Sequence, residues 1–350
     1  MLKILRPIPI VVALATALIF PVFFPNPAIL NIALYTLMYV GLASAWNILG
    51  GYAGYINLGI SAFYGIGGYS FAIFLHSVNA VPGYGSFLWV PLVGVFTAIV
   101  GVPLGWAACR TRHAVFVTVT VAMFFVVQLL AENWSGLTGG STGYGFPIPK
   151  WSPSYYYKPF YYAMLAAAIF TVFISFVIRR SGFGLGLMSI RDDEDKAEAI
   201  GVPTTLYKVV AFSISAGLAG MIGAIFTYSV LYIYPQNAVD PLISTGSVLA
   251  AFLGGTGTLL GPVVGALILV PAQTELSYYV NGQLYLVLYG GLFLLIMRVL
   301  PRGILPTVSE FIRTSRHRRS DTLMKVPAVI EQGSAVCPDE PLSMVEGELP

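Results

Sequence analysis

The chain has 350 residues, of which 57% are hydrophobic and only 9% charged, and its mean hydropathy is +0.80. Because soluble domains contain about 25% charged residues, this composition excludes an ordinary soluble domain and predicts an all-α polytopic membrane protein. The two cysteines, Cys109 and Cys337, lie far apart in the sequence and predict neither a disulfide framework nor a metal site.

Apolar stretches of about twenty residues predict about 8–10 transmembrane helices. The N-terminal stretch follows Lys3 and Arg6 and lacks a small-residue cleavage site, which favours a retained span over a signal peptide. The stretch 243–254 is too short to cross comfortably, so a re-entrant half-helix is the alternative there. The stretches lie near residues 8–24, 28–48, 56–75, 85–107, 114–131, 160–178, 206–233, 243–254, 262–280 and 284–300.

The distribution of Lys and Arg predicts the orientation of these spans. With about ten crossings, Arg110 and Arg112, the charged stretch 179–208 and the basic run 313–325 all fall on the cytoplasmic side, as do both termini. From about residue 313 the apolar periodicity is lost, and Pro, Ser, Gly and acidic residues recur. The sequence therefore predicts a transmembrane domain over 1–312 and a disordered cytoplasmic tail over 313–350.

Charge is concentrated in one internal stretch. Of the 33 Lys, Arg, Asp and Glu residues, 10 lie between Arg179 and Lys208, and 14 lie from Arg298 to the end. Asp192 or Asp193 can cap a short helix, which Gly201 then terminates.

Within this helix, Asp192 and Lys196 stand four residues apart and can pair, while Ala197 and Ile200 give a small apolar face. A helix of about nine residues is marginal alone, because isolated helices below ~12–15 residues seldom persist in water. We therefore predict a helix that docks into a groove on a partner, with a solvated linker as the alternative. The candidate coupling residues are Asp192, Asp193, Lys196, Glu198, Ala199 and Gly201.

Glycine interrupts two apolar regions, one in each half of the chain, at 50–59 and at 254–261. Unwound backbone at membrane depth is tolerated where it is buried in protein or lines a wet cavity, and paired interruptions indicate a translocation site and a weak internal repeat. The alternative is that these glycines only let helices approach closely, the interpretation that we prefer for Gly217, Gly220 and Gly223. The pathway candidates are Gly54, Asn57, Gly59, Ser61, Gly254, Gly255, Gly257 and Gly261.

No motif in the sequence supplies chemistry or energy. We find no phosphate-binding loop, no dinucleotide fingerprint, no metal-ligand cluster and no catalytic constellation, so no cofactor is expected. Ionisable residues are scarce within the spans, and Glu132 and Asp240 are expected at outer span ends. This scarcity weakens the case for an ion-coupled carrier.

Several of these segments resemble one family. The segment 51–69, Gly-Tyr-Ala-Gly-Tyr-Ile-Asn-Leu-Gly-Ile-Ser-Ala-Phe-Tyr-Gly-Ile-Gly-Gly-Tyr, looks like the opening of branched-chain amino acid ABC-transporter permeases of the LivM type. The charged segment 189–212 resembles that family's cytoplasmic loop, 253–266 its late glycine-rich element, and 138–143 a weaker signature. Together these segments fall in order within residues 30 to 300.

The resemblance implies an inner-membrane permease subunit of an importer for branched-chain amino acids, without an ATPase site of its own. Its partners would be a second, LivH-like permease, two cytoplasmic ATP-binding subunits and a periplasmic solute-binding protein. Glu198, Ala199 and Gly201 stand at the ATPase-contacting positions of the family loop, where Ile200 replaces a second alanine. The alternatives are a permease for urea or short-chain amides, an ATP-independent channel or secondary carrier, and, least favoured, a membrane-embedded enzyme.

Overall fold

The computed structural model describes residues 8–307 except 79–81, 154, 281 and 300–302. Lys3, Arg6 and the predicted tail 313–350 lie outside the described residues. The elements are α1 (Ile8–Phe23), α2 (Pro27–Gly50), α3 (Ile60–Ser77), η1 (Tyr84–Trp89), α4 (Val90–Cys109), α5 (His113–Asn133), α6 (Ser135–Thr138), η2 (Gly140–Thr142), β1 (Tyr144–Gly145), α7 (Tyr157–Arg180), α8 (Gly182–Asp192), α9 (Glu194–Ala199), α10 (Thr204–Val230), β2 (Tyr232–Ile233), α11 (Pro235–Ala238), α12 (Pro241–Gly254), α13 (Gly261–Tyr279) and α14 (Gly282–Val299).

The long helices confirm the all-α polytopic membrane class. Within the described residues, five helical stretches are long and apolar enough to cross a membrane, namely α2, η1 with α4, α5, α7 and α10. The other predicted stretches correspond to α1, α3, α12, α13 and α14, which have between 14 and 19 residues. With 14 residues α12 is only about 21 Å long, shorter than the roughly 30 Å hydrocarbon core, as its sequence indicates.

Helix α10 is the centre of the packing. It contacts α3 and α4 on one side and α2 and α7 on the other, and small residues let these neighbours approach closely. A Cβ atom added to Gly223 would lie 2.0 Å from the Tyr64 carbonyl oxygen, and one added to Gly220 would lie 2.6 Å from Thr97 Cβ. For these glycines the close-approach interpretation is therefore confirmed.

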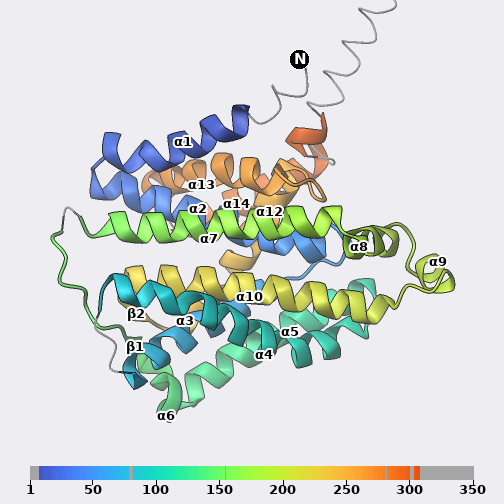
Figure 1. Ribbon diagram of the computed structural model, residues 1–350, viewed down its shortest axis with the longest axis horizontal. Helices are drawn as coiled ribbons and strands as arrows, with labels where there is room; N and C mark the ends of the chain where they lie inside the picture. The colour runs from blue at the N-terminus through green and yellow to red at the C-terminus, as the bar shows by residue number, and fades with distance from the viewer. Residues whose placement is uncertain (1–7, 79–81, 154, 281, 300–302, 308–350) are drawn as a thin grey trace, which may run out of the picture. The chain divides into compact units, whose positions relative to one another are not determined.

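The connections gather at the two ends of the helices. Figure 1 shows α8 and α9 at one end of α7 and α10, and β1 and β2 at the other. The two strands pair antiparallel, with Tyr144 opposite Ile233 and Gly145 opposite Tyr232. This small sheet ties the segment before α7 to the end of α10.

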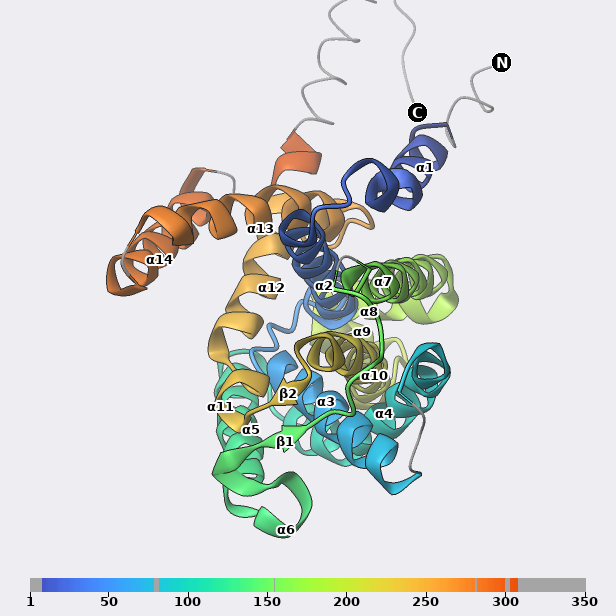
Figure 2. The ribbon, with the colours of Figure 1, turned by 90° about the vertical axis from the view of Figure 1, so that its left-hand side faces the viewer.

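The last helices lie on the other face of α2. Helix α12 contacts α2 and α13, α13 also contacts α2, and α14 contacts α12 and α13 (Figure 2). Helix α2 therefore stands between α7 and α10 on one side and the α12–α13 pair on the other. Both glycine-interrupted regions follow helices of this group, because one begins where α2 ends and the other where α12 ends.

Candidate coupling site and the glycine-interrupted segments

The charged stretch forms two helices rather than one. Asp192 ends α8, and Asp193 caps α9 by accepting a hydrogen bond from the Lys196 backbone N–H at 3.1 Å. The Lys196 ammonium pairs with Asp193 at 2.9 Å, so the predicted pairing with Asp192 is wrong. This contact lowers the pKa of Asp193 and raises that of Lys196. Gly201 adopts a left-handed φ of 92°, which explains why a glycine ends the helix.

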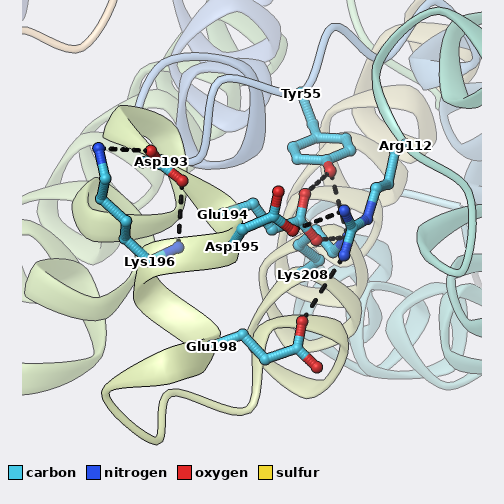
Figure 3. Close-up of polar contacts among 8 residues, drawn as sticks. All are labelled: Tyr55, Arg112, Asp193, Glu194, Asp195, Lys196, Glu198 and Lys208. Atoms are coloured by element: carbon cyan, nitrogen blue, oxygen red, sulfur yellow. Dashed lines mark hydrogen bonds and ion pairs between the residues drawn. The ribbon is translucent and has the colours of Figure 1, made fainter.

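A buried ion pair fastens α9 to the first turns of α10. The Lys208 ammonium donates to Glu194 at 2.7 Å, and the side chains of these two residues are only 2% and 6% exposed. The buried Tyr55 hydroxyl donates to the other carboxylate oxygen of Glu194 and accepts from Lys208 at 3.2 Å (Figure 3). Burial raises the pKa of Glu194, but the hydrogen bonds from Lys208 and Tyr55 outweigh it, so its pKa lies below the ordinary value.

An exposed ion pair adds a second attachment. Arg112, between α4 and α5, donates to Asp195 at 2.7 Å and lies 3.6 Å from Glu198 (Figure 3). The hydrogen bond from Arg112 to Asp195 and the charge of that carboxylate raise the pKa of Arg112. Exposed pairs of this kind are screened by water and contribute little to stability, so the buried pair dominates the attachment.

The two sides of α9 differ sharply in exposure. Glu194 and Ala197 are buried against the protein, whereas Glu198 and Ala199 are exposed and Ile200 is 76% exposed. Ala197 and Ile200 therefore do not share one apolar face, contrary to the prediction, because Ile200 lies beyond the last helical residue. Asp192, Lys196 and Gly201 are also exposed, so most of the candidate coupling residues face away from the described protein.

The first glycine-interrupted segment is non-helical backbone inside the helical layer. A Cβ atom on Gly59 would lie 2.7 Å from the carbonyl oxygen of Thr120, which is two turns, or about 10 Å, into α5. The Trp46 indole donates to the Asn57 carbonyl at 2.8 Å, and the Asn57 side chain accepts from the Gly59 N–H at 2.8 Å. Asn57 thus precedes α3, which begins at Ile60, although the predicted span 56–75 included it.

Ser61 begins a separate contact with α12. The Ser244 hydroxyl donates to the Ser61 hydroxyl at 2.8 Å and accepts from the Ser61 backbone N–H at 3.1 Å. Both serines are fully buried. This pair joins the first turn of α3 to the first turn of α12.

The second glycine-interrupted segment lies against the end of α2. Asn47, which is 1% exposed, donates to the Thr258 carbonyl at 2.9 Å and accepts from the Gly257 N–H at 2.9 Å. Gly255 and Gly257 have left-handed φ values of 116° and 75°. Gly254 and Gly261 flank this segment, and a Cβ on Gly254 would lie 1.6 Å from the Gly261 carbonyl oxygen.

Arg191 of α8 reaches both interrupted segments. Its guanidinium donates to the Gly51 carbonyl at 2.8 Å, and its stem lies 3.1 Å from the position of a Cβ on Gly54. The same guanidinium lies 2.3 Å from the position of a Cβ on Gly257, where only a glycine leaves it room. The two segments, about 200 residues apart in the sequence, therefore meet around one side chain of the helix that precedes α9.

Sequence reasoning missed four residues of this arrangement: Tyr55, Asn47, Lys208 and the bridging role of Arg191. No spacing rule links Glu194 to Tyr55, because their contact is made only in three dimensions. For Lys208 the sequence contained a weak indication of an ion pair, since a lysine within the first turns of an apolar span requires a partner. In the described part of the chain, no group of His, Cys, Asp and Glu residues is arranged to hold a metal ion.

The sequence of the chain is similar to a known family of membrane proteins. The family model of the branched-chain amino acid transport system permease component matches residues 28–297. The high-affinity branched-chain amino acid permease protein LivM of Salmonella typhimurium is 29% identical over 311 residues, covering 81% of this chain and 71% of that protein. LivM of Escherichia coli is 28% identical, covering 85% of this chain and 74% of that protein.

A second kind of permease is also similar. LivH of Salmonella typhimurium is 23% identical over 285 residues, which cover 77% of this chain and 91% of that protein. No solved structure gives a significant match. The match of the family model extends from α2 into α14 and includes both interrupted segments and α9. The chain belongs to the family of branched-chain amino acid transport system permease components.

Proposed function

We propose that the chain is the membrane-spanning permease subunit of an ABC importer that moves branched-chain amino acids (leucine, isoleucine and valine) across the inner membrane. ATP hydrolysis on two cytoplasmic partner subunits supplies the energy, and a second, LivH-like permease and a periplasmic solute-binding protein complete the complex. The end of the molecule that carries α8 and α9 faces the cytoplasm, and both chain termini lie on that side.

The observation that carries this proposal is the construction of α9. One side is held by a buried ion pair and the other presents Glu198, Ala199 and Ile200 to the surroundings. A six-residue helix has little stability of its own. Its attachment to the rest of the protein allows it to transmit a displacement made by a partner. The similarity to LivM, named as a branched-chain amino acid permease protein, supports the substrate.

The mechanism follows from the attachments. Movement of the ATP-binding subunits displaces α9, and the Glu194–Lys208 pair passes the displacement to α10, the central helix. Arg191 passes it to the interrupted segments, whose backbone is not locked in a helix. Alternating access then results from reorientation of α10 and these segments around a central pathway.

Docking is tested with Ala199→Trp in the complete transporter, reconstituted in liposomes with its ATP-binding subunits and binding protein. We expect weaker association of the ATP-binding subunits and leucine uptake reduced about tenfold or more, because a bulky side chain prevents a close-packed contact. Gln236→Trp, at an exposed position of α11 at the opposite end, is the matched control. Wild-type uptake with an intact association in Ala199→Trp would rule out the docking role.

The other candidates predict different results in the same system. A permease for urea or short-chain amides would transport those solutes, and its binding protein would retain them instead of leucine. An ATP-independent channel or carrier would give uptake with the chain alone in liposomes, without ATP-binding subunits.

A further inference from the structure

A cavity of about 470 Å³ lies between α2, α12 and α13, away from the glycine-interrupted segments. None of the eight pathway candidates lines it. Tyr35, on its α2 wall, is eight residues, or about 12 Å, from the start of that helix, and Gln273 is about 18 Å from the start of α13. The cavity therefore lies partway along α2 and α13, and its volume falls within the range of small-molecule sites.

Asp240 lines this cavity at the start of α12. One carboxylate oxygen caps α12 by accepting from the Leu242 N–H at 2.8 Å. Among the residues that the structure describes, no Lys, Arg or His forms an ion pair with Asp240. A carboxylate that lines a cavity without a cation partner can accept a hydrogen bond from a cationic ligand. As the sequence predicts, this residue stands at the end of a span, where it caps α12, and it lines the cavity together with Tyr35.

Gln273 of α13 is an independent observation on the opposite wall. Its side chain is 9% exposed, and within the described ranges it has no hydrogen-bond partner. Among the described residues, its amide is not one of the buried polar groups that lack a partner, so it opens onto the cavity, where a ligand can pair with it. The remaining wall is mixed: Ile32, Leu242, Ile243 and Phe226 are its apolar part, and Asn31, Tyr35, Tyr39, Thr274 and Ser277 its polar part.

These groups match the parts of one class of molecule. The acceptor Asp240 suits a cation, the amide of Gln273 donates to an anion, and Ile243 and Phe226 suit an aliphatic group. We propose that this cavity binds the amino acid in transit, with Asp240 accepting from its α-ammonium group and Gln273 donating to its carboxylate. This inference rests on the proposed function, which supplies the amino acid.

The test uses the complete transporter with its binding protein, reconstituted in liposomes, and measures ATP-driven leucine uptake and ATP hydrolysis. Asp240→Asn keeps the helix cap but removes the charge. We expect uptake to fall roughly tenfold or more while hydrolysis stimulated by the binding protein persists, and Asp240→Glu to restore part of the uptake. Thr245→Val, on the same helix but outside the cavity wall, is expected to transport like the wild type.

Gln273→Leu provides a second variant that does not touch the helix cap, and the same loss of uptake is expected of it. If Asp240→Asn or Gln273→Leu transports leucine at the wild-type rate, the binding site is refuted. Wild-type uptake is measured in parallel, so the two proposals fail separately. A wild-type complex that imports no amino acid contradicts the proposed function, whereas normal uptake by the variants contradicts only the cavity's role.

Discussion

At the scale of single residues, the Glu194–Lys208 pair is the contact that contributes most to the attachment of α9. Removal of one partner from a buried ion pair typically costs about 3–5 kcal/mol, because the other charge stays buried without compensation. We therefore expect Glu194→Gln to lower the free energy of unfolding of the detergent-solubilised protein by roughly this amount.

The double variant Glu194→Leu/Lys208→Met separates the free-energy cost of an unpaired buried charge from the contribution of the ion pair to stability. An apolar pair of similar volume is often neutral relative to a buried ion pair, so most of the lost stability should return. Equal stabilities of Glu194→Gln and the wild type in chemical unfolding would show that the pair is not buried as described.

The same residue predicts a dependence on pH. Because the pKa of Glu194 is lower in the folded protein than its ordinary value of 4.5, its contact stabilises the fold fully above that value. This stability is lost as the pH falls below 4.5 and through the lower native pKa. Unfolding free energies measured from pH 7 to pH 3 should show this loss in the wild type, and Glu194→Gln should lack that part of it.

The sequence predicted residues of this site unevenly. The helix cap and the glycine stop are local features, so Gly201 and a cap at Asp192 or Asp193, of which the structure shows Asp193, were predicted from their neighbours alone. Tyr55 and Asn47 act through contacts with residues distant in the chain, and no local periodicity reveals such contacts. Asp240 was noticed as a charge at a span end, but its place on the cavity wall beside Tyr35 is set by the fold.

At the scale of elements, the close packing of α10 makes a sharp prediction. Gly223→Ala places a methyl group against the Tyr64 carbonyl oxygen, a backbone atom that has little room to move. We expect a loss of about 1–3 kcal/mol in the free energy of unfolding, from overpacking.

The control is Gly136→Ala in α6, where an added Cβ meets no atom within 4 Å. This change should leave stability unaltered or raise it by about 0.4–1 kcal/mol, because alanine restricts the unfolded chain. A Gly223→Ala variant as stable as Gly136→Ala would mean that α3 and α10 are not in close contact.

Element boundaries were predicted best where hydrophobic length decides them. The span predicted at 160–178 is α7 (Tyr157–Arg180), and that at 262–280 is α13 (Gly261–Tyr279). The sequence did not predict α8, which α7 leads into through Ser181, because its three glycines and its two charges at the very end lack a strong helical pattern. The β1–β2 pair was missed because two-residue strands have no periodicity to detect.

At the scale of the whole molecule, the proposed orientation is open to chemical labelling. Glu198→Cys should react with an impermeant maleimide only from the cytoplasmic side, and Tyr155→Cys only from the outer side. The background variant replaces Cys337 with serine, and Cys109 is buried. Right-side-out and inverted vesicles distinguish the two faces, and labelling of both positions from one side would contradict the orientation.

The position of Arg191 has a consequence for timing. Because one guanidinium touches Gly51 and lies beside Gly257, the two interrupted segments have one contact in common, besides the separate contacts that each makes with α2. A displacement of this side chain therefore reaches both segments at once. We expect this shared contact to keep their movements in step, without any signal passing from one half of the chain to the other.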